Sequence, residues 1–463
     1  MANFKYNPPT RDFCPVCLEI AENFGRPVID TYEGKASSAD GSPIHNWFYF
    51  VLGYSPAFPE YVFKREGINS SQLIADPFMG TGTTLVAARQ NCINSMGIDA
   101  NDFFIEVAST KTYLNVNKEE LQIKAEDFLK LLERELSKFF VHSPESLFSD
   151  LNTDHESLVD YSQKNRPAML EERYICDIPF AKLHIAKSIL MKMDFEDKNV
   201  KGILKLAIDS LIVPASNVRY GPGFGISSKK KLDVDIIKML AKKIRRMIED
   251  IKNFECSGST ATIFHGDARR METYFGHEEV DFLITSPPYP GDHEYTKHTR
   301  LELIFNNIAT TKDEFKVIKK RMLRGSTTNL YKEDNDKELV EKIKEIEKIV
   351  ELIAERLIAD LDKSERQQLS GFEKLYTKLV WEYFGGMARV FDAALKTLKP
   401  GGKFILLVSD SHAFKMVHIK TALILGEIAK SRGFSLVEIE LWQNKISTSH
   451  KYNIPEEVLT LTK

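Results

Sequence analysis

A proline-rich corner, Thr285–Tyr289 (Thr-Ser-Pro-Pro-Tyr), carries the residue types best suited to chemistry on a planar base. It follows the apolar run Val280–Ile284, which predicts a buried strand. Two successive prolines cannot continue the hydrogen bonding of a strand, so Ser286 and Tyr289 are expected to be held at its carboxyl end. The serine oxygen and a proline carbonyl can accept both N–H groups of an exocyclic amine while the base stacks on the tyrosine ring. The corner therefore predicts a site that grips an amino-bearing base and leaves the nitrogen lone pair free to attack.

A glycine-rich turn, Asp76–Thr84 (DPFMGTGTT), is the second group of candidate residues. It follows a short predicted strand at 73–75 and precedes a predicted helix, and its glycines let the backbone approach a ligand closely. Thr83 or Thr84 is expected to cap that helix. The spacing is Gly-x-Gly without a third glycine, and Asp76 stands at the strand end. Because a carboxylate repels phosphate and attracts an ammonium group, the turn favours a ligand with a cationic tail over a dinucleotide.

Together, TSPPY and the upstream DPFMGTGTT resemble the catalytic and cofactor signatures of the amino-group DNA methyltransferases, which methylate N4 of cytosine or N6 of adenine. The resemblance covers residues 45–108, 258–305 and 370–445, with the cofactor half first and the catalytic half second. It implies an α/β fold, a Rossmann-like S-adenosylmethionine-dependent methyltransferase sheet with largely helical insertions. The catalytic residues that it implies are Ser286, Pro287, Pro288 and Tyr289.

The expected cofactor is S-adenosylmethionine rather than NAD, because its ammonium group suits Asp76. An acidic residue about 20 positions after the glycine turn is placed to accept ribose hydroxyls, and Asp99 has that spacing. The resemblance places Asp267, at the end of the strand pattern 260–268, against the amino group of adenine. It also implies that the turn Ser55–Pro59, within the aromatic segment 45–67, helps to close the cofactor pocket. The complete set of expected cofactor contacts is Asp76, Pro77, Phe78, Gly80, Gly82, Thr83, Thr84, Asp99 and Asp267.

Transfer from a sulfonium to an amine needs geometry more than acid-base power, because the leaving group is already activated by its charge. No Pro-Cys dipeptide occurs in the sequence, so the covalent route to carbon 5 of cytosine lacks its usual nucleophile signature. A target inside a stacked duplex cannot be reached, so base flipping is implied, with Tyr289 as the stacking platform. Within the family, serine at position 286 favours cytosine N4 over adenine N6. The alternatives are an adenine N6 enzyme, an RNA amino-group methyltransferase, and a non-catalytic DNA-binding subunit that retains the scaffold.

Two stretches interrupt the resemblance and are expected to be largely helical. Residues 109–257 are the candidate target-recognition insertion, and residues 306–369 are a second insertion with candidate DNA contacts. In the first, apolar residues recur at helical spacing at Leu121, Phe128, Leu132, Leu136 and Phe139. In the second, the apolar positions from Leu339 to Leu357 alternate spacings of four and three, which predicts a helical hairpin or short coiled coil. Residues 1–44 are expected to be an N-terminal arm, and residues 45–108, 258–305 and 370–463 the catalytic domain.

The segment 217–231 combines glycines, aromatics and a lysine run, which suits contact with phosphates and bases. A solvated flexible loop is the alternative interpretation. The second insertion adds a basic segment that suits groove contacts. The expected contacts to double-stranded DNA are Arg219, Tyr220, Lys229, Lys230, Lys231 and Arg324. The resemblance also raises a cognate restriction endonuclease as a partner.

Composition narrows the class of protein further. The 463 residues carry a formal net charge of −3, which argues against a protein that coats nucleic acid by bulk charge. No signal core or membrane-spanning stretch is visible, so a cytoplasmic protein is expected. The five cysteines do not form a disulfide framework, and free reduced thiols are expected. Cys14 and Cys17 have the spacing of half a zinc knuckle without a second pair nearby, so no metal is expected.

Overall fold

The computed structural model describes residues 42–463 apart from 142–151, 154, 221–223, 257, 292–293, 365–367 and 447–452. The expectations for the N-terminal arm up to residue 41, including Cys14 and Cys17, lie outside the described residues. None of the helices in the described part of the chain is both long and apolar enough to cross a membrane.

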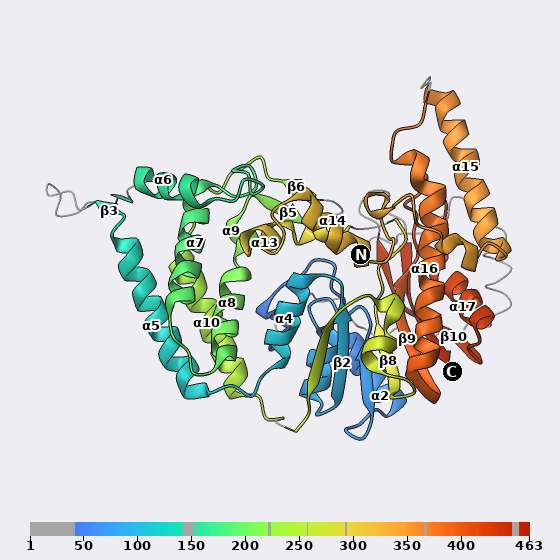
Figure 1. Ribbon diagram of the computed structural model, residues 1–463, viewed down its shortest axis with the longest axis horizontal. Coiled ribbons are helices and arrows are strands. Elements are labelled where there is room, and N and C mark those ends of the chain that lie inside the picture. The colour runs from blue at the N-terminus through green and yellow to red at the C-terminus, as the bar shows by residue number, and fades with distance from the viewer. Residues whose placement is uncertain are drawn as a thin grey trace, which may run out of the picture.

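A seven-stranded sheet forms the centre of the molecule, in the order β10-β11-β9-β8-β1-β2-β7 (Figure 1). The strands from β9 to β7 pair in parallel, and β11 is antiparallel to both of its neighbours. The Rossmann-like α/β fold is thus confirmed. The strands are β1 (Leu73–Asp76), β2 (Asn94–Asp99), β7 (Ala261–His265), β8 (Val280–Thr285), β9 (Leu398–Ser409), β10 (Leu436–Ile446) and β11 (Asn453–Thr462).

Both faces of this sheet are covered by helices, because its central strands are apolar on both sides. On β8, Phe282 and Ile284 pack with α2 (Ala57–Glu66) and α3 (Thr83–Gln90), whereas Leu283 packs with the opposite layer. That opposite layer is formed by α16 (Tyr376–Thr397) and α17 (Thr421–Arg432). The alternation follows from the two-residue period of a strand.

The first insertion forms a helical bundle beside the sheet, at the left of Figure 1. The predicted stripe lies on α5, where Leu121, Phe128, Leu132 and Leu136 are buried, and Phe139 follows the end of the helix. The helices from the sheet through the bundle are α4 (Asp102–Thr112), α5 (Lys118–Ser137), α6 (His155–Asn165), α7 (Asp177–Lys192), α8 (Lys198–Asp209), α9 (Ile212–Ala215) and α10 (Ile236–Lys252). A small hairpin of β5 (Val218–Tyr220) and β6 (Phe224–Ile226) precedes α10.

α13 (Arg300–Phe305) leads into the second insertion, which contains α14 (Lys312–Arg321) and α15 (Lys344–Ser364). Ile346, Ile353 and Leu357 of α15 are buried in the same apolar cluster as α16, and the two helices lie side by side in Figure 1. The predicted helical spacing is therefore borne out by α15, but its partner α16 lies in the stretch assigned to the catalytic domain rather than in the insertion. Short elements complete the description: η1 (His45–Trp47), β3 (Phe140–Val141), β4 (Asn152–Thr153), η2 (Ala268–Arg270), α11 (Glu272–Phe275), α12 (Tyr295–His298), η3 (Thr327–Asn329), η4 (Asp336–Leu339) and η5 (Glu373–Leu375).

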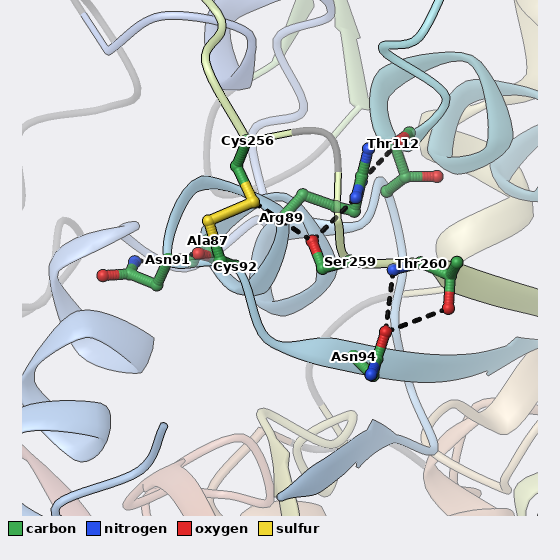
Figure 2. Close-up of a disulfide and its surroundings, with 9 residues drawn as sticks. All are labelled: Ala87, Arg89, Asn91, Cys92, Asn94, Thr112, Cys256, Ser259 and Thr260. Carbon is green, nitrogen blue, oxygen red and sulfur yellow. Dashed lines mark hydrogen bonds between the residues drawn. A yellow bond between two sulfur atoms is a disulfide. The ribbon is translucent and has the colours of Figure 1, made fainter. Parts of the chain in front are cut away.

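A disulfide joins Cys92, just after α3, to Cys256, just before β7 (Figure 2). The two Cα atoms are 5.7 Å apart although 164 residues separate the cysteines in sequence. The expectation that all five thiols are free and reduced is therefore wrong for this pair, while Cys176 is free and buried. The reason is tertiary: β2 and β7 pair in parallel, which brings the segments that lead into both strands together. The bond also ties the end of the first insertion to the segment between α3 and β2 at the edge of the sheet.

Candidate active site

The two sequence motifs lie on adjacent strands. β1 leads into the glycine turn, β8 leads into the proline-rich corner, and Ala75 of β1 pairs with Leu283 of β8. The chain runs from β1 outward to β2 and β7 and then returns to β8, so the strand order reverses between β1 and β8. Ligands of open α/β sheets bind in the crevice at such a switch point, beyond the carboxyl ends of the strands.

The glycine turn is built on two residues with positive φ, Gly80 at 51° and Gly82 at 85°. Gly82 is the N-cap of α3 and makes no side-chain capping bond, so the expectation that Thr83 or Thr84 caps this helix is wrong. Thr84 instead bonds the Tyr54 hydroxyl. A side chain at position 82 would also be crowded, since an added Cβ would lie 3.1 Å from the Cβ of Ala108. Glycine is therefore required here by both conformation and space.

Asp76 is fully buried at the end of β1 and joins the two motifs. Its carboxylate accepts from the Tyr54 hydroxyl at 2.8 Å, from the Phe78 amide at 3.0 Å and from the Thr285 hydroxyl at 2.5 Å. Burial raises the pKa of Asp76 to about 6, although these hydrogen bonds favour its charged form. The carboxylate therefore ties the glycine turn to the strand that carries the corner, and its contact with an ammonium group stays a prediction.

One pocket extends from the glycine turn to the proline-rich corner. Eight residues expected from the sequence line it: Pro77, Phe78, Gly80, Thr83, Asp99, Asp267, Ser286 and Pro288. The other expected residues of the two motifs, Asp76, Gly82, Thr84, Pro287 and Tyr289, are not part of this lining. The glycine turn and the proline-rich corner thus share a single cavity.

The pocket suits a nucleoside with a cationic tail better than a phosphate-bearing ligand. Asp99 accepts from the Gly80 amide at 2.9 Å, and burial raises the pKa of Asp99 to about 7. The arginines of the described lining are already paired, Arg269 with Asp267 at 2.7 Å and Arg321 with Asp102 at 3.2 Å. Neutralised cations attract phosphate weakly. The apolar part of the lining can face a purine ring and comprises Phe78, Met79, Phe104, Met322 and Leu323.

Two parts of this pocket were not expected from the sequence. The residues that close it ahead of the glycine turn are 50 and 52–54, rather than the turn Ser55–Pro59, because Phe58 packs fully buried in the core beneath the sheet. The second insertion also contributes to the lining, through 321–323, Gly325 and Asn329. The Gly291 amide donates to the Gly325 carbonyl at 3.0 Å, which joins this insertion to the loop after the corner. The aromatic density of 45–67 signalled the first part, but no spacing in the sequence signalled the second.

Arg324 does not fit the expected role as a DNA contact. Its side chain is 7% exposed, and its Nε and Nη2 atoms donate to the Asp334 carboxylate, each at 2.9 Å. Its Nη1 atom donates to the carbonyl of Met322 at 2.7 Å. A guanidinium that is buried and held by these partners is not free to bind a phosphate, which argues against this prediction, and Arg324 instead holds the loop beside the pocket.

The other expected DNA contacts lie on or after the β5–β6 hairpin. Arg219, Lys229, Lys230 and Lys231 are exposed, whereas the side chain of Tyr220 lies outside the described part of the chain. The Lys230 ammonium lies 3.5 Å from the Glu172 carboxylate, and the Lys231 ammonium donates to the Pro214 carbonyl at 2.6 Å. Contact of these cations with DNA stays a prediction.

Comparison with known proteins agrees with this geometry. Residues 54–110, which include the glycine turn, match a family model described as DNA methylase. The chain is 24% identical over 462 residues to the Type II methyltransferase M.BsoBI of Geobacillus stearothermophilus, covering 94% of this chain and 86% of that protein. It is 22% identical over 448 residues to the Type II methyltransferase M.AvaI of Nostoc sp., covering 91% of this chain and 84% of that protein. The family-model match and these relatives support an amino-group DNA methyltransferase.

A further relative of this methyltransferase is the Type II methyltransferase M.MjaII of Methanocaldococcus jannaschii. It is 25% identical over 322 residues, covering 54% of this chain and 60% of that protein. S-Adenosylmethionine is the methyl donor of the family, and the pocket has the carboxylates and apolar walls that such a ligand needs. No group of His, Cys, Asp or Glu in the described residues is arranged to hold a metal ion.

Proposed function

We propose that this methyltransferase transfers a methyl group from S-adenosylmethionine to the exocyclic N4 of a flipped cytosine at a specific site in double-stranded DNA. The observation that carries the proposal is the shared pocket, because the glycine turn and Ser286 line the same cavity. Direct transfer requires donor and acceptor to be held in contact. Two motifs in separate cavities would not allow it.

The chain's own residues would divide the work. Asp99 would accept the ribose hydroxyls, and Asp267 would accept from the adenine amino group while it remains paired with Arg269. The bound cofactor supplies an activated methyl group on a positively charged sulfur. Ser286 and the Pro287 carbonyl would accept the two N–H groups of the target amine, and Tyr289 would stack on the flipped base.

The choice of cytosine N4 rests on Ser286, because serine at this position favours cytosine in the family. Adenine N6 is the alternative that shares the same pocket and the same exocyclic amine. The RNA alternative is disfavoured because the relatives reported above are named as Type II methyltransferases. The non-catalytic alternative is disfavoured by the intact lining at Gly80, Asp99 and Ser286.

The test is a transfer assay with cofactor labelled on the methyl group. The protein is incubated with heterologous genomic DNA, with RNA, or with neither, and the nucleic acid is digested to nucleosides. We expect label in DNA alone, recovered as N4-methylcytosine. Label recovered as N6-methyladenine would overturn the base assignment, and label in RNA alone would overturn the DNA assignment. As a matched comparison, Ser286→Ala should lower kcat by about 100-fold because one of two acceptors is lost, whereas Ser70→Ala, in the exposed turn before β1, should leave kcat unchanged.

A further inference from the structure

A buried carboxylate, Glu456, lies behind the proline-rich corner. It is on β11, and its residue is 2% exposed. One carboxylate oxygen lies 3.4 Å from the Tyr289 hydroxyl and 2.5 Å from the Lys445 ammonium. The other oxygen accepts from the Gln443 amide at 2.5 Å. The charge of Glu456 is therefore held in place by a cation and by an amide donor from the neighbouring strand β10.

The contact continues from Tyr289 to the base-holding serine. The Tyr289 hydroxyl lies 3.2 Å from Ser286 Oγ, so the three side chains form a line from Glu456 to the pocket. Glu456 itself is not part of the lining of the shared pocket, whereas Ser286 is. Glu456 does line a neighbouring cavity together with Tyr54 and Thr83, and its contact toward Ser286 runs through Tyr289.

The direction of these hydrogen bonds is fixed by chemistry at one end. An ionised carboxylate can only accept, so the Tyr289 hydroxyl must donate its single proton to Glu456. The Tyr289 oxygen is then left as an acceptor for the Ser286 hydroxyl proton. With its proton turned away from the pocket, Ser286 presents only lone pairs to the cavity. Without the carboxylate, tyrosine could donate to serine instead, and the serine proton could then turn toward the amine and oppose its N–H groups.

We propose that Glu456 is a positioning residue that, through Tyr289, sets Ser286 as a hydrogen-bond acceptor for the exocyclic amine of the target base. The inference rests on the proposed function and deepens it. It explains why the Ser286 hydroxyl accepts a hydrogen bond from an amine instead of donating one to a carbonyl. It also explains why this corner carries tyrosine, since a phenylalanine would stack equally well but could not relay the hydrogen-bond direction.

The test is a double-mutant cycle on Glu456 and Tyr289, measured with the labelled-cofactor assay. Glu456→Leu should lower kcat about tenfold or more, with KM for DNA changed by no more than about twofold, because binding surfaces are intact and only the amine contact is lost. Tyr289→Phe should lower kcat to a similar extent. The double variant should be no slower than Tyr289→Phe alone, because residues that act through one another are not additive. Glu456→Gln, which keeps the size of the side chain, should fall between wild type and Glu456→Leu, and serves if the leucine variant does not fold.

The sheet offers a matched control in Glu440 of β10. Its carboxylate lies 3.3 Å from the Tyr61 hydroxyl and 2.8 Å from the Arg65 guanidinium, so it repeats the tyrosine–carboxylate–cation arrangement away from the pocket. Glu440→Leu should lower stability but leave kcat of the folded protein unchanged. A loss of kcat in this variant equal to that in Glu456→Leu would overturn the relay and indicate a general effect of the sheet edge.

The remaining outcomes separate the relay from the proposed function. If wild type labels DNA but the losses from Glu456→Leu and Tyr289→Phe multiply, the relay is wrong and the methyl transfer stands. If Glu456→Leu keeps full kcat, the relay is likewise wrong. If wild type labels no nucleic acid, the proposed function fails and the relay fails with it.

Discussion

Glu302 is a buried acid outside the shared pocket, and it makes the stability of the protein depend on pH. It lies on α13, is 2% exposed, and its Oε2 atom has no hydrogen-bond partner among the described residues. Burial raises the pKa of Glu302 to about 8, and the nearby Asp209 carboxylate acts in the same direction. An acid whose pKa is higher in the folded than in the unfolded chain favours folding at low pH and loses that contribution as pH rises.

Glu302→Gln should therefore change stability in a pH-dependent way. At pH 5 the folded wild type holds a proton on Glu302, so glutamine, a neutral group of the same size, should be nearly neutral in effect. As pH rises from the pKa of Glu302 in the unfolded chain to its pKa in the folded chain, the free energy of unfolding of the wild type falls steadily. At pH 8 the variant should therefore be more stable than the wild type by roughly 2 to 4 kcal/mol. Denaturant unfolding at the two pH values measures this. An equal change at both would show that Glu302 titrates alike in the folded and unfolded chain.

At the residue scale, the sequence located single positions better than it located their partners. Gly80, Asp99 and Ser286 were found from motif spacing, and all three line one pocket. The bonds of Tyr54 to Asp76 and of Arg324 to Asp334 could not be found this way. Such partners are chosen by tertiary contacts, for which a single sequence carries no periodic signal.

The loop after α14 is stabilised by the buried side chain of Arg324. Arg324→Ala should lower the free energy of unfolding by about 3 to 5 kcal/mol, because it leaves the Asp334 carboxylate buried without its partner. The salt dependence of DNA binding should not change. Thermal unfolding and a salt titration of binding measure the two effects. Arg324→Leu combined with Asp334→Leu should recover much of the stability. A flatter salt slope for DNA binding in Arg324→Ala would show that Arg324 contacts DNA and would contradict this prediction.

The β5–β6 hairpin and the lysines after it are the element proposed to contact DNA. Replacing Lys229, Lys230 and Lys231 with alanine should weaken DNA binding and reduce the slope of log K against log salt by about 1 to 2. A reduction below 3 is expected because Lys231 is engaged with the Pro214 carbonyl. Binding measured from low to moderate salt gives the slope. A matched triple variant replaces three exposed cations at the C-terminal end of α5 and at its C-cap: Lys130, Arg134 and Lys138. It should leave the slope unchanged, and equal slopes for both triples would remove the proposal.

Elements with strong apolar periods were predictable, and elements defined by pairing were not. α5 and α15 followed from helical spacing. By contrast, Lys-Pro-Gly-Gly at 399–402 has the composition of a tight turn, yet it is part of β9. Gly401 has φ 76° there, and the pairing with β8 steps from Val280↔Leu398 to Phe282↔Lys403. The extra residues bulge while the ladder continues on both sides. The position of β11 between β9 and β10 was not predicted from the sequence. The order of strands in a sheet is set by which strands pair, and a local sequence pattern does not show this.

At the scale of the whole molecule, the Cys92–Cys256 disulfide closes a loop that contains the first insertion. Replacing both cysteines with serine should lower the free energy of unfolding by about 2 to 4 kcal/mol, because the unfolded chain regains the freedom of that long loop. Neither cysteine lines the shared pocket, so kcat should be unchanged. Unfolding in the presence and absence of a reductant measures the effect in wild type. The double serine variant should be insensitive to the reductant, and an insensitive wild type would contradict the prediction.

Cys92 is exposed and Cys256 is half-buried, so the bond can meet small thiols from solvent. A preparation handled in air would then contain the disulfide, and one handled with dithiothreitol would contain the two free thiols. The two forms differ in mass by only two hydrogens. They would differ in mobility on a non-reducing gel, since one is a large ring and the other a linear chain. Melting curves from different laboratories would be comparable only when the state of this pair is stated alongside them.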